Sequence, residues 1–214
     1  MREVLLDIYR RLFDHYGPQN WWPADDPFEV IVGAILTQST AWTNVEQAIS
    51  NLKAANGLTP TALYDLPLEK LAQLIRSSGY YNAKALKLKA FADRLHSKYN
   101  SDLEGLFTLD TTTLRPELLS IYGIGEETAD SIILYAARRP IFVIDAYTRR
   151  IVSRLGLDPG KDSYSAFQAL FTENLPHDEG LFNEYHALLV RQGKEVCRKT
   201  PRCTLCCLRS LCSH

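Results

Sequence analysis

The sequence has no cysteine before residue 197, no apolar run long enough to span a bilayer and almost no net charge, −1 over 214 residues. The missing cysteines argue against a secreted, disulfide-stapled protein, because such proteins use cysteines to join distant elements. Without a long apolar run, a membrane-spanning helix is not expected. The amino-terminal segment is amphipathic and charged throughout, unlike a signal peptide. We therefore expect a protein of the cytoplasm.

The sequence also lacks alternating strand patterns, low-complexity tracts and internal repeats. Apolar residues, 46% of the total, recur instead at helical spacing between turn signals. This content suffices for a substantial core. The sequence therefore predicts an all-α protein of many short helices. We expect them at 1–17, 42–54, 67–76, 82–99, 114–122, 126–137, 146–155, 163–175 and 180–197, and also within 26–40. The segment 26–40 is apolar all round, which predicts a buried helix, although its Val and Ile residues would also suit a strand.

Positive charge gathers in two segments although the net charge is near zero. Residues 191–214 contain six Lys or Arg and one acid, Glu195, and residues 138–154 contain five arginines and one acid, Asp145. Local patches of this kind are typical of a surface that binds a polyanion. Solvated helix faces would give the same pattern, so charge alone leaves both interpretations open.

All five cysteines lie within 197–212, and setting Cys207 aside gives the spacing C-x5-C-x2-C-x5-C. Cysteines crowded into one segment favour a metal site in a reducing compartment over free thiols. Zinc sites usually pair two Cys-x2–4-Cys knuckles, whereas this segment has one such pair. Four thiolates can also ligate an iron–sulfur cube. We therefore predict a [4Fe–4S] cluster held by Cys197, Cys203, Cys206 and Cys212.

The segment LLSIYGIGEETADSIILYA, residues 118–136, has the pattern of two helices joined by a tight turn. Gly123 and Gly125 can take positive φ and leave their amide groups unobstructed. Amides at a helix N-terminus attract an anion, and a phosphate diester fits that geometry. An ordinary turn between two helices would also use glycine, so these residues alone do not decide the matter.

Several motifs in order resemble the helix-hairpin-helix DNA glycosylases related to endonuclease III. They are VGAILTQST, SSGYYNAKA, GIGEETAD followed by an apolar run and VID, and the carboxyl-terminal cysteines, whose first gap is one residue shorter than usual in that family. The resemblance covers most of the chain. It implies two helical domains with the active-site cleft between them, one at 23–139 and one formed by 1–22 and 140–214.

The resemblance assigns roles to individual residues. It implies that the hairpin Gly123-Ile124-Gly125 binds DNA and that Asp145 is the catalytic carboxylate, although Asp145 could also be a simple helix N-cap. Members that cleave the DNA backbone use a lysine to form a Schiff base with the sugar. This chain has Glu127 at that position, which cannot form an imine. The implied enzyme is a monofunctional glycosylase without lyase activity.

Other residues are assigned to base extrusion and to the base pocket. Gln38 lies where the family inserts a polar side chain into the vacated space, and Tyr80 where one enters the opposite strand. The alternatives are a helix-end polar residue and a surface aromatic. Trp22, Pro23 and Trp42 are possible pocket walls, because indole faces stack on electron-poor alkylated purines. Core packing also buries tryptophans.

The loop between the first two cysteines is basic and predicts a phosphate-binding segment formed by Arg198, Lys199 and Arg202. The WWP segment and Glu127 resemble a narrower branch that includes bacterial 3-methyladenine glycosylases. We expect a monomeric repair enzyme that acts on double-stranded DNA, associates with the nucleoid when bound and removes an alkylated purine. A mismatch or oxidised-base glycosylase and a non-catalytic DNA-binding module remain alternatives.

Overall fold

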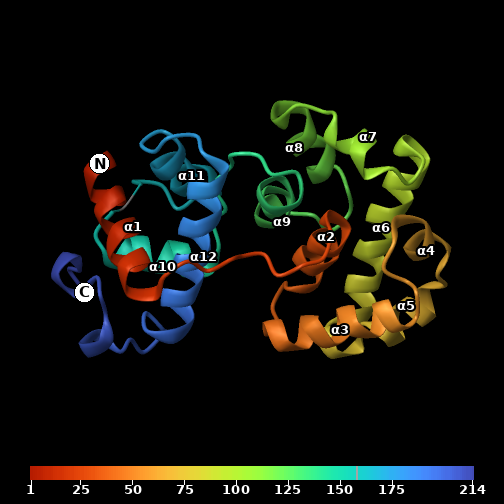
Figure 1. The fold of residues 1–214 in the computed structure, drawn as a ribbon, viewed down its shortest axis with the longest axis horizontal. Helices are drawn as coiled ribbons and strands as arrows, with labels where there is room; N and C mark the ends of the chain where they lie inside the picture. The colour runs from red at the N-terminus through yellow and green to blue at the C-terminus, as the bar shows by residue number, and fades with distance from the viewer. Residues whose placement is uncertain (158) are drawn as a thin grey trace. The chain divides into compact units, whose positions relative to one another are not determined.

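The computed structural model describes residues 1–157 and 159–214, and every regular element in them is helical (Figure 1). The predicted all-α fold is therefore confirmed. No helix in this part of the chain combines the length and hydropathy that crossing a bilayer requires. The chain forms two compact units, a terminal unit of Met1–Trp22 with Arg138–His214 and a central unit of Pro23–Ala137.

The central unit contains helices α2 to α9. A 3₁₀ turn at Arg76–Ser78 precedes α6, and a π-helical turn at Ile132–Ala136 extends α9. The helix bounds are α2 Pro27–Leu36, α3 Trp42–Ala54, α4 Pro60–Asp65, α5 Leu68–Leu74, α6 Tyr81–Tyr99, α7 Leu103–Phe107, α8 Thr111–Leu119 and α9 Glu126–Ser131.

Helix α2 lies at the core of the central unit. The Asp26 carboxylate caps it by accepting hydrogen bonds from the backbone N–H groups of Phe28 at 2.8 Å and Glu29 at 2.9 Å. Pro27 occupies the first helical position, where its missing N–H is not needed. All later residues of α2 are buried, and the helix contacts α3, α6 and α9. The expectation of a buried helix is met.

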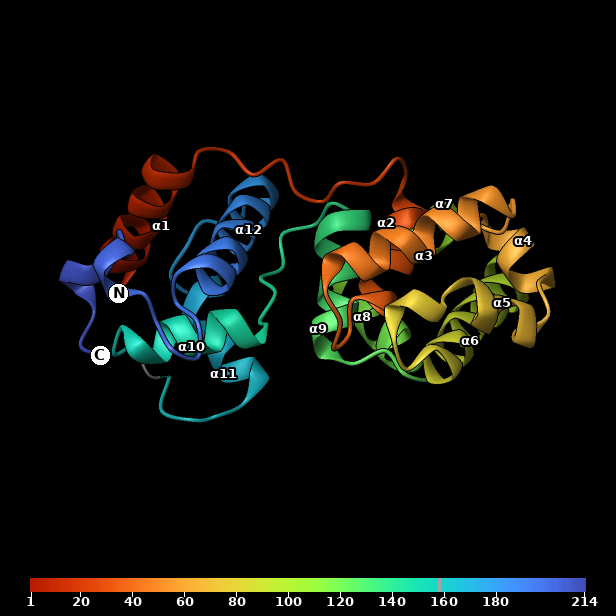
Figure 2. The ribbon, with the colours of Figure 1, turned by 90° about the horizontal axis from the view of Figure 1, so that it is seen from below.

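The terminal unit is organised around α12 (Glu179–Glu195). This helix packs against α1 (Arg2–Tyr16), beside which it lies in both ribbon views, and against α10 (Ala146–Arg154) (Figures 1 and 2). The Tyr185 hydroxyl donates to the carbonyl of Leu5 at 2.9 Å, which ties α12 to α1. Helix α11 (Tyr164–Thr172) and two 3₁₀ turns, Cys203–Leu205 and Arg209–Leu211, complete the unit.

Gly193 allows α10 and α12 to approach closely. A Cβ atom at this position would lie 2.5 Å from Cδ1 of Tyr147, too close for any side chain without a shift of the ring. A glycine inside a helix is otherwise unfavourable by roughly 1 kcal/mol relative to alanine. The close approach matters because Asp145 caps the start of α10 and faces His186 on α12.

The helix predictions differ from the structure in α4, α7 and the start of α8. Helices α4 and α7 span six and five residues and were not predicted, because so few residues give little periodicity. Helix α8 begins at Thr111, three residues before the predicted start at 114, because the cluster Asp110–Thr113 forms its cap and first turn. The Asp110 carboxylate accepts a hydrogen bond from the N–H of Thr113 at 2.9 Å, so this cluster is a capped first turn and Pro116 lies inside the helix.

Candidate functional site

The predicted hairpin joins α8 to α9 in the central unit. Gly123 has φ 81°, in the left-handed region that favours glycine. Gly125 has φ −94° and ψ −179°, extended backbone that any residue adopts. The expectation of positive φ is therefore wrong for Gly125. What Gly125 provides is space, because a Cβ atom built there has no other atom within 4 Å.

An ion pair fixes the two helices of the hairpin. Arg115 on α8 donates to Asp130 on α9 through Nε–Oδ1 at 2.7 Å and Nη2–Oδ2 at 3.2 Å. Asp130 is fully buried, and its hydrogen bonds to Arg115 raise the pKa of the guanidinium. Bidentate pairs of this kind fix geometry as well as adding energy. Asp130, which ends the TAD motif, therefore has a structural role.

The structure brings Gln38 and the hairpin together. The Gln38 amide Nε2 donates to the Thr128 hydroxyl at 2.9 Å and to the carbonyl of Gly123 at 3.4 Å. The ammonium of Lys87 donates to Gln38 Oε1. The alkyl chain of Lys87 lies over Gly123, so that a Cβ atom there would clash with Lys87 Cγ. The Gln38 side chain thus lies against the hairpin.

Tyr80 projects from the loop before α6. It is 76% exposed and has a left-handed backbone with φ 46°, and the preceding Gly79 has φ 66°. Single exposed aromatic residues are common on protein surfaces, so exposure alone does not assign Tyr80 a role. A second exposed aromatic, Tyr122, is 65% exposed directly before the hairpin glycine. Tyr122 was not predicted to be an exposed aromatic beside the hairpin, although its position next to Gly123 was the available signal.

Asp145 begins α10 in the terminal unit. Its Oδ1 accepts a hydrogen bond from the N–H of Thr148 at 2.7 Å, so it is the N-cap of that helix. Its Oδ2 lies 4.0 Å from Nε2 of His186 on α12. Both residues are buried, at 8% and 6% exposed. The cap uses one carboxylate oxygen, and the other faces an imidazole.

The position of His186 beside Asp145 was not predicted from the sequence. Burial lowers the pKa of this imidazole below its usual value, and the negative charge of Asp145 opposes that shift only in part. A histidine with a lowered pKa is neutral near pH 7. The available signal was a lone histidine within the apolar pattern of the predicted 180–197 helix.

Glu127 lies in the first turn of α9 and is exposed. An acid at this end of a helix interacts favourably with the helix dipole. Glu127 belongs to the central unit, whereas Asp145 belongs to the terminal unit.

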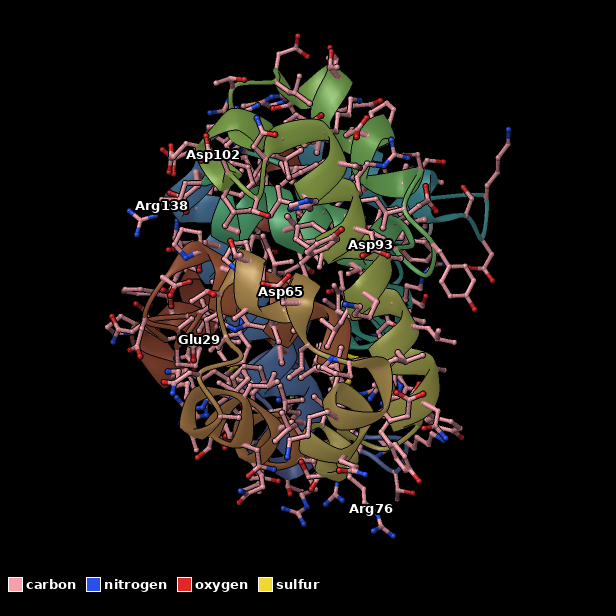
Figure 3. All side chains as sticks on the ribbon, turned by 90° about the vertical axis from the view of Figure 1, so that its right-hand side faces the viewer. Glu29, Asp65, Arg76, Asp93, Asp102 and Arg138 are labelled. Carbon is pink, nitrogen blue, oxygen red and sulfur yellow. The ribbon has the colours of Figure 1, made fainter. Side chains whose placement is uncertain are left out.

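Pro23 and Trp42 line one hollow in the central unit. Glu29, labelled in Figure 3, is also in its wall and is 5% exposed. The Lys53 ammonium, which also lines the hollow, pairs with Glu29 at 2.9 Å and with Asp25 at 2.6 Å. The structure thus brings together two of the three predicted pocket residues beside a group of charges.

The third predicted pocket residue, Trp22, belongs to the terminal unit. It is half-buried, with its ring centroid 5.2 Å from that of Trp21. The ammonium of Lys194 on α12 lies 5.9 Å from the centroid of the Trp21 ring.

Four of the five cysteines line a single hollow in the terminal unit, and Cys207 is not in its wall. In the described residues, no group of three or more Cys, His, Asp or Glu side chains converges as one metal ion requires. A cube needs no such convergence, because each of its irons takes its own thiolate. The four lining residues are Cys197, Cys203, Cys206 and Cys212.

Side-chain donors point at two of these sulfur atoms. Arg154 Nη1 lies 3.3 Å from Cys197 Sγ, and Gln192 Nε2 lies 3.1 Å from Cys206 Sγ. Gln192 is 1% exposed and also accepts a hydrogen bond from the Tyr16 hydroxyl at 2.6 Å. Donors to the sulfurs are among the features that tune and stabilise thiolate-ligated clusters. The donor set therefore fits an iron–sulfur centre.

Two arginines of α10 hold the cysteine loop. Arg154 donates to the carbonyls of Arg198 at 2.7 Å and Lys199 at 3.0 Å. Arg150 donates to the carbonyl of Cys197 at 2.8 Å. The charge pattern at 138–154 did not indicate this role. The basic side chains of the loop itself, those of Arg198, Lys199 and Arg202, are exposed.

The chain is similar to known repair proteins along nearly all its length. The profile of the HhH-GPD superfamily of base excision DNA repair proteins matches residues 32–177. A candidate DNA repair glycosylase of Methanocaldococcus jannaschii is 47% identical over 211 residues, 98% of this chain and 96% of that protein. Endonuclease III of Sulfolobus acidocaldarius is 31% identical over 189 residues, 87% of this chain and 82% of that protein.

The fold agrees with this similarity. The crystal structure of H. pylori 3-methyladenine DNA glycosylase bound to 1,N6-ethenoadenine has a TM-score of 0.76 and 27% identity, over 90% of this chain and 96% of that chain. The resemblance to endonuclease III-related glycosylases is thereby confirmed. The chain belongs to the HhH-GPD superfamily of base excision DNA repair proteins.

Proposed function

We propose that this protein is a monofunctional DNA glycosylase that hydrolyses the N-glycosidic bond of an alkylated purine in double-stranded DNA. The observation that carries the proposal is the Asp145 carboxylate, buried at a helix start with one oxygen capping α10 and the other facing His186. Membership of a base excision repair superfamily supports the assignment.

In the proposed reaction, ionised Asp145 stabilises the positive charge that develops on the sugar as the base leaves. It then orients or deprotonates the attacking water. The Thr148 N–H fixes the carboxylate, and the His186 imidazole, kept neutral by burial, adds no positive charge to weaken its field. A purine that carries a positive charge from alkylation of a ring nitrogen already leaves readily, so one carboxylate suffices.

Glu127 supports a hydrolytic reaction without lyase activity. Backbone cleavage in this superfamily starts with an amine that attacks the sugar, and a carboxylate cannot form the required imine. The expected product is an abasic site in an intact strand.

The hollow at Pro23 and Trp42 supports a cationic base as substrate. An indole face attracts a positively charged purine by roughly 0.5–2 kcal/mol, and carboxylates nearby favour the same charge. The similar H. pylori protein is a 3-methyladenine glycosylase, which agrees with this preference. Trp22 is also proposed to contact the base. The charged residues that line the hollow are three acids and one base, Asp25, Glu29, Glu46 and Lys53.

DNA binding is proposed at two phosphate-contacting elements and two inserting side chains. The hairpin at 123–125 offers amide groups, and the cysteine loop offers exposed cations at 198–202. Gln38 fills the space left by the extruded base, and exposed Tyr80 enters the opposite strand. The protein acts as a monomer in this proposal.

A [4Fe–4S] cluster is proposed as the cofactor. Cys197, Cys203, Cys206 and Cys212 would hold it, since they line one hollow and two of their sulfurs have side-chain N–H donors. When bound, the cluster supplies a rigid thiolate-ligated frame for the loop rather than redox catalysis. Arg154 then fixes the two carbonyls at 198 and 199 and directs the loop's cations into solvent.

The test is a panel of duplexes that each carry one lesion, treated with alkali after incubation to reveal abasic sites. We expect strand breaks at alkylated purines. Breaks at oxidised or mismatched bases instead would keep the enzyme class and change the substrate. Binding without any breaks would leave a non-catalytic DNA-binding module.

A further inference from the structure

One buried ammonium connects the two loops that carry Gln38 and Tyr80. Lys84 on α6 is 2% exposed, and its Nζ donates to the carbonyls of Leu36 at 2.9 Å and Ser78 at 2.6 Å. Leu36 ends α2 two residues before Gln38, and Ser78 ends the 3₁₀ turn two residues before Tyr80. The same side chain therefore grips both loops at equivalent points.

The chemistry of Lys84 suits this task. A buried charge is costly unless it is hydrogen-bonded, and the last carbonyls of a helix lack helical N–H partners. Charge-assisted hydrogen bonds are roughly twice as strong as neutral ones. Burial lowers the pKa of Lys84 to about 8, with the charge of Lys87 acting in the same direction. Two helical ends and one ammonium thus satisfy each other.

Resting on the proposed function, we propose that Lys84 is a positioning residue for base extrusion. It fixes the loop of Gln38 relative to the loop of Tyr80, so that both side chains are in place when the base leaves the stack. The 3₁₀ turn that Lys84 holds presents Arg76 outward, and Figure 3 shows its side chain extending from the surface. The turn therefore begins at an exposed residue, Arg76, and ends at a buried one, Ser78.

Lys89 on the same helix offers a matched control. Its ammonium donates to the carbonyls of Leu63 at 3.3 Å, Tyr64, and Leu66 at 3.2 Å, at the end of α4. It is a partly buried lysine that also bridges carbonyls, but no proposed DNA-contacting residue lies within a few positions of those carbonyls. Loss of either lysine therefore removes comparable bonds from the fold, and only one of them concerns the inserting side chains.

The first measurement is amide hydrogen exchange on the DNA-free protein, which does not depend on activity. Lys84→Met should accelerate exchange at 37–40 and at 79–81 together, and Lys89→Met only around 63–66. Lys84→Arg, which can still donate to both carbonyls, should restore protection. Faster exchange in only one loop, or in neither, would overturn the link. If Lys84→Met does not fold, Lys84→Gln replaces it, with the same pattern expected at smaller size.

The second measurement is single-turnover excision from a paired lesion and from the same lesion in a bulge. Extrusion costs least for an unpaired base, so Lys84→Met should slow the paired substrate by about tenfold and the bulged one clearly less. Lys89→Met should leave the ratio of the two rates unchanged. Equal slowing on both substrates, or an equal change of the ratio in Lys89→Met, would refute the positioning role. If the wild type excises neither, the proposed function fails, while the exchange result still decides the link.

Discussion

The hairpin and the cysteine loop are both proposed to hold DNA phosphates, but they are built differently. The hairpin offers backbone amides at Gly123 and Gly125 and is fixed by the Arg115–Asp130 ion pair. The cysteine loop offers long cationic side chains and is fixed by Arg154, with the proposed cluster as a further support. Amides act only at close approach, whereas cations act at longer range and are screened by salt. The hairpin should therefore be sensitive to shape and the loop to ionic strength.

The largest expected effect is a loss of base excision that leaves DNA binding by the hairpin and the cysteine loop intact. Asp145→Asn keeps the size and the capping ability of the side chain, so the fold and the binding of lesion duplex should survive. It removes the charge that we propose stabilises the sugar cation, so excision should slow on the order of 10²–10³-fold. Single-turnover excision beside a binding titration measures the two quantities.

The control for this variant is Asp130→Asn, which alters a buried carboxylate in the hairpin instead. It breaks the pair with Arg115 and should lower stability and DNA binding rather than affect chemistry selectively. If Asp145→Asn excises the base at a near wild-type rate, the carboxylate is only a helix cap.

Loss of the proposed cluster should affect the cysteine loop and not the hairpin, so it tests most directly how the two elements differ. Protein prepared without oxygen should contain about four iron atoms per chain. Cys203→Ala should lose the iron and weaken DNA binding, while the Arg115–Asp130 pair preserves the hairpin. Cys207→Ala is the matched control and should keep full iron, because Cys207 is not in the wall of the hollow. Stoichiometric zinc without iron in the wild type would contradict the assignment.

The two hairpin glycines should fail in different ways. Gly123→Ala forces a side chain into a left-handed backbone, which costs roughly 1–2 kcal/mol, and it also displaces Lys87. Its thermal unfolding should therefore show lower stability. Gly125→Val fits its extended backbone and open surroundings, so stability should be retained, but the side chain should block the approach of a phosphate. Equal stability losses in both variants would mean that the turn is not built as described.

The long helices, the hairpin and the cap at Asp145 could be predicted from local sequence signals. Each depends on a few adjacent residues, such as the Asp-Pro start of α2 or the glycine before α9. The roles of His186, Arg150 and Arg154 depend instead on residues over 40 positions away that packing brings close. Periodicity and charge counts contain no information on such pairings.

The expectation of positive φ at Gly125 was wrong for a related reason. Sequence indicates that a glycine can take positive φ, but the fold decides whether the turn requires it. In this hairpin one such residue, Gly123, is enough to reverse the chain.

A smaller effect is expected from the loop's charges. Replacing Arg198, Lys199 and Arg202 together by Gln should flatten the salt dependence of binding, and the slope should fall by about one for each phosphate that the variant no longer neutralises. A control with three other exposed basic residues replaced (Arg2, Arg10 and Lys70) removes equal charge and should leave the slope nearly unchanged. An unchanged slope in the loop variant would remove the loop from the binding face and leave the hairpin as the main phosphate-binding element.

The last prediction is a negative result: no covalent protein–DNA adduct should form. The hairpin end of α9 presents Glu127, where lyase members of the family have a lysine, so borohydride should trap no protein–DNA complex during turnover. A bifunctional endonuclease III under the same conditions shows that trapping works.

An amine close to the hairpin glycine in the central unit is that of Lys87. Its alkyl chain lies over Gly123, and its ammonium donates to Gln38. If an adduct forms efficiently, Lys87→Met is the variant to test first. Loss of the adduct in that variant would identify Lys87 as the nucleophile and make the enzyme bifunctional, whereas its persistence would require an amine from elsewhere in the chain.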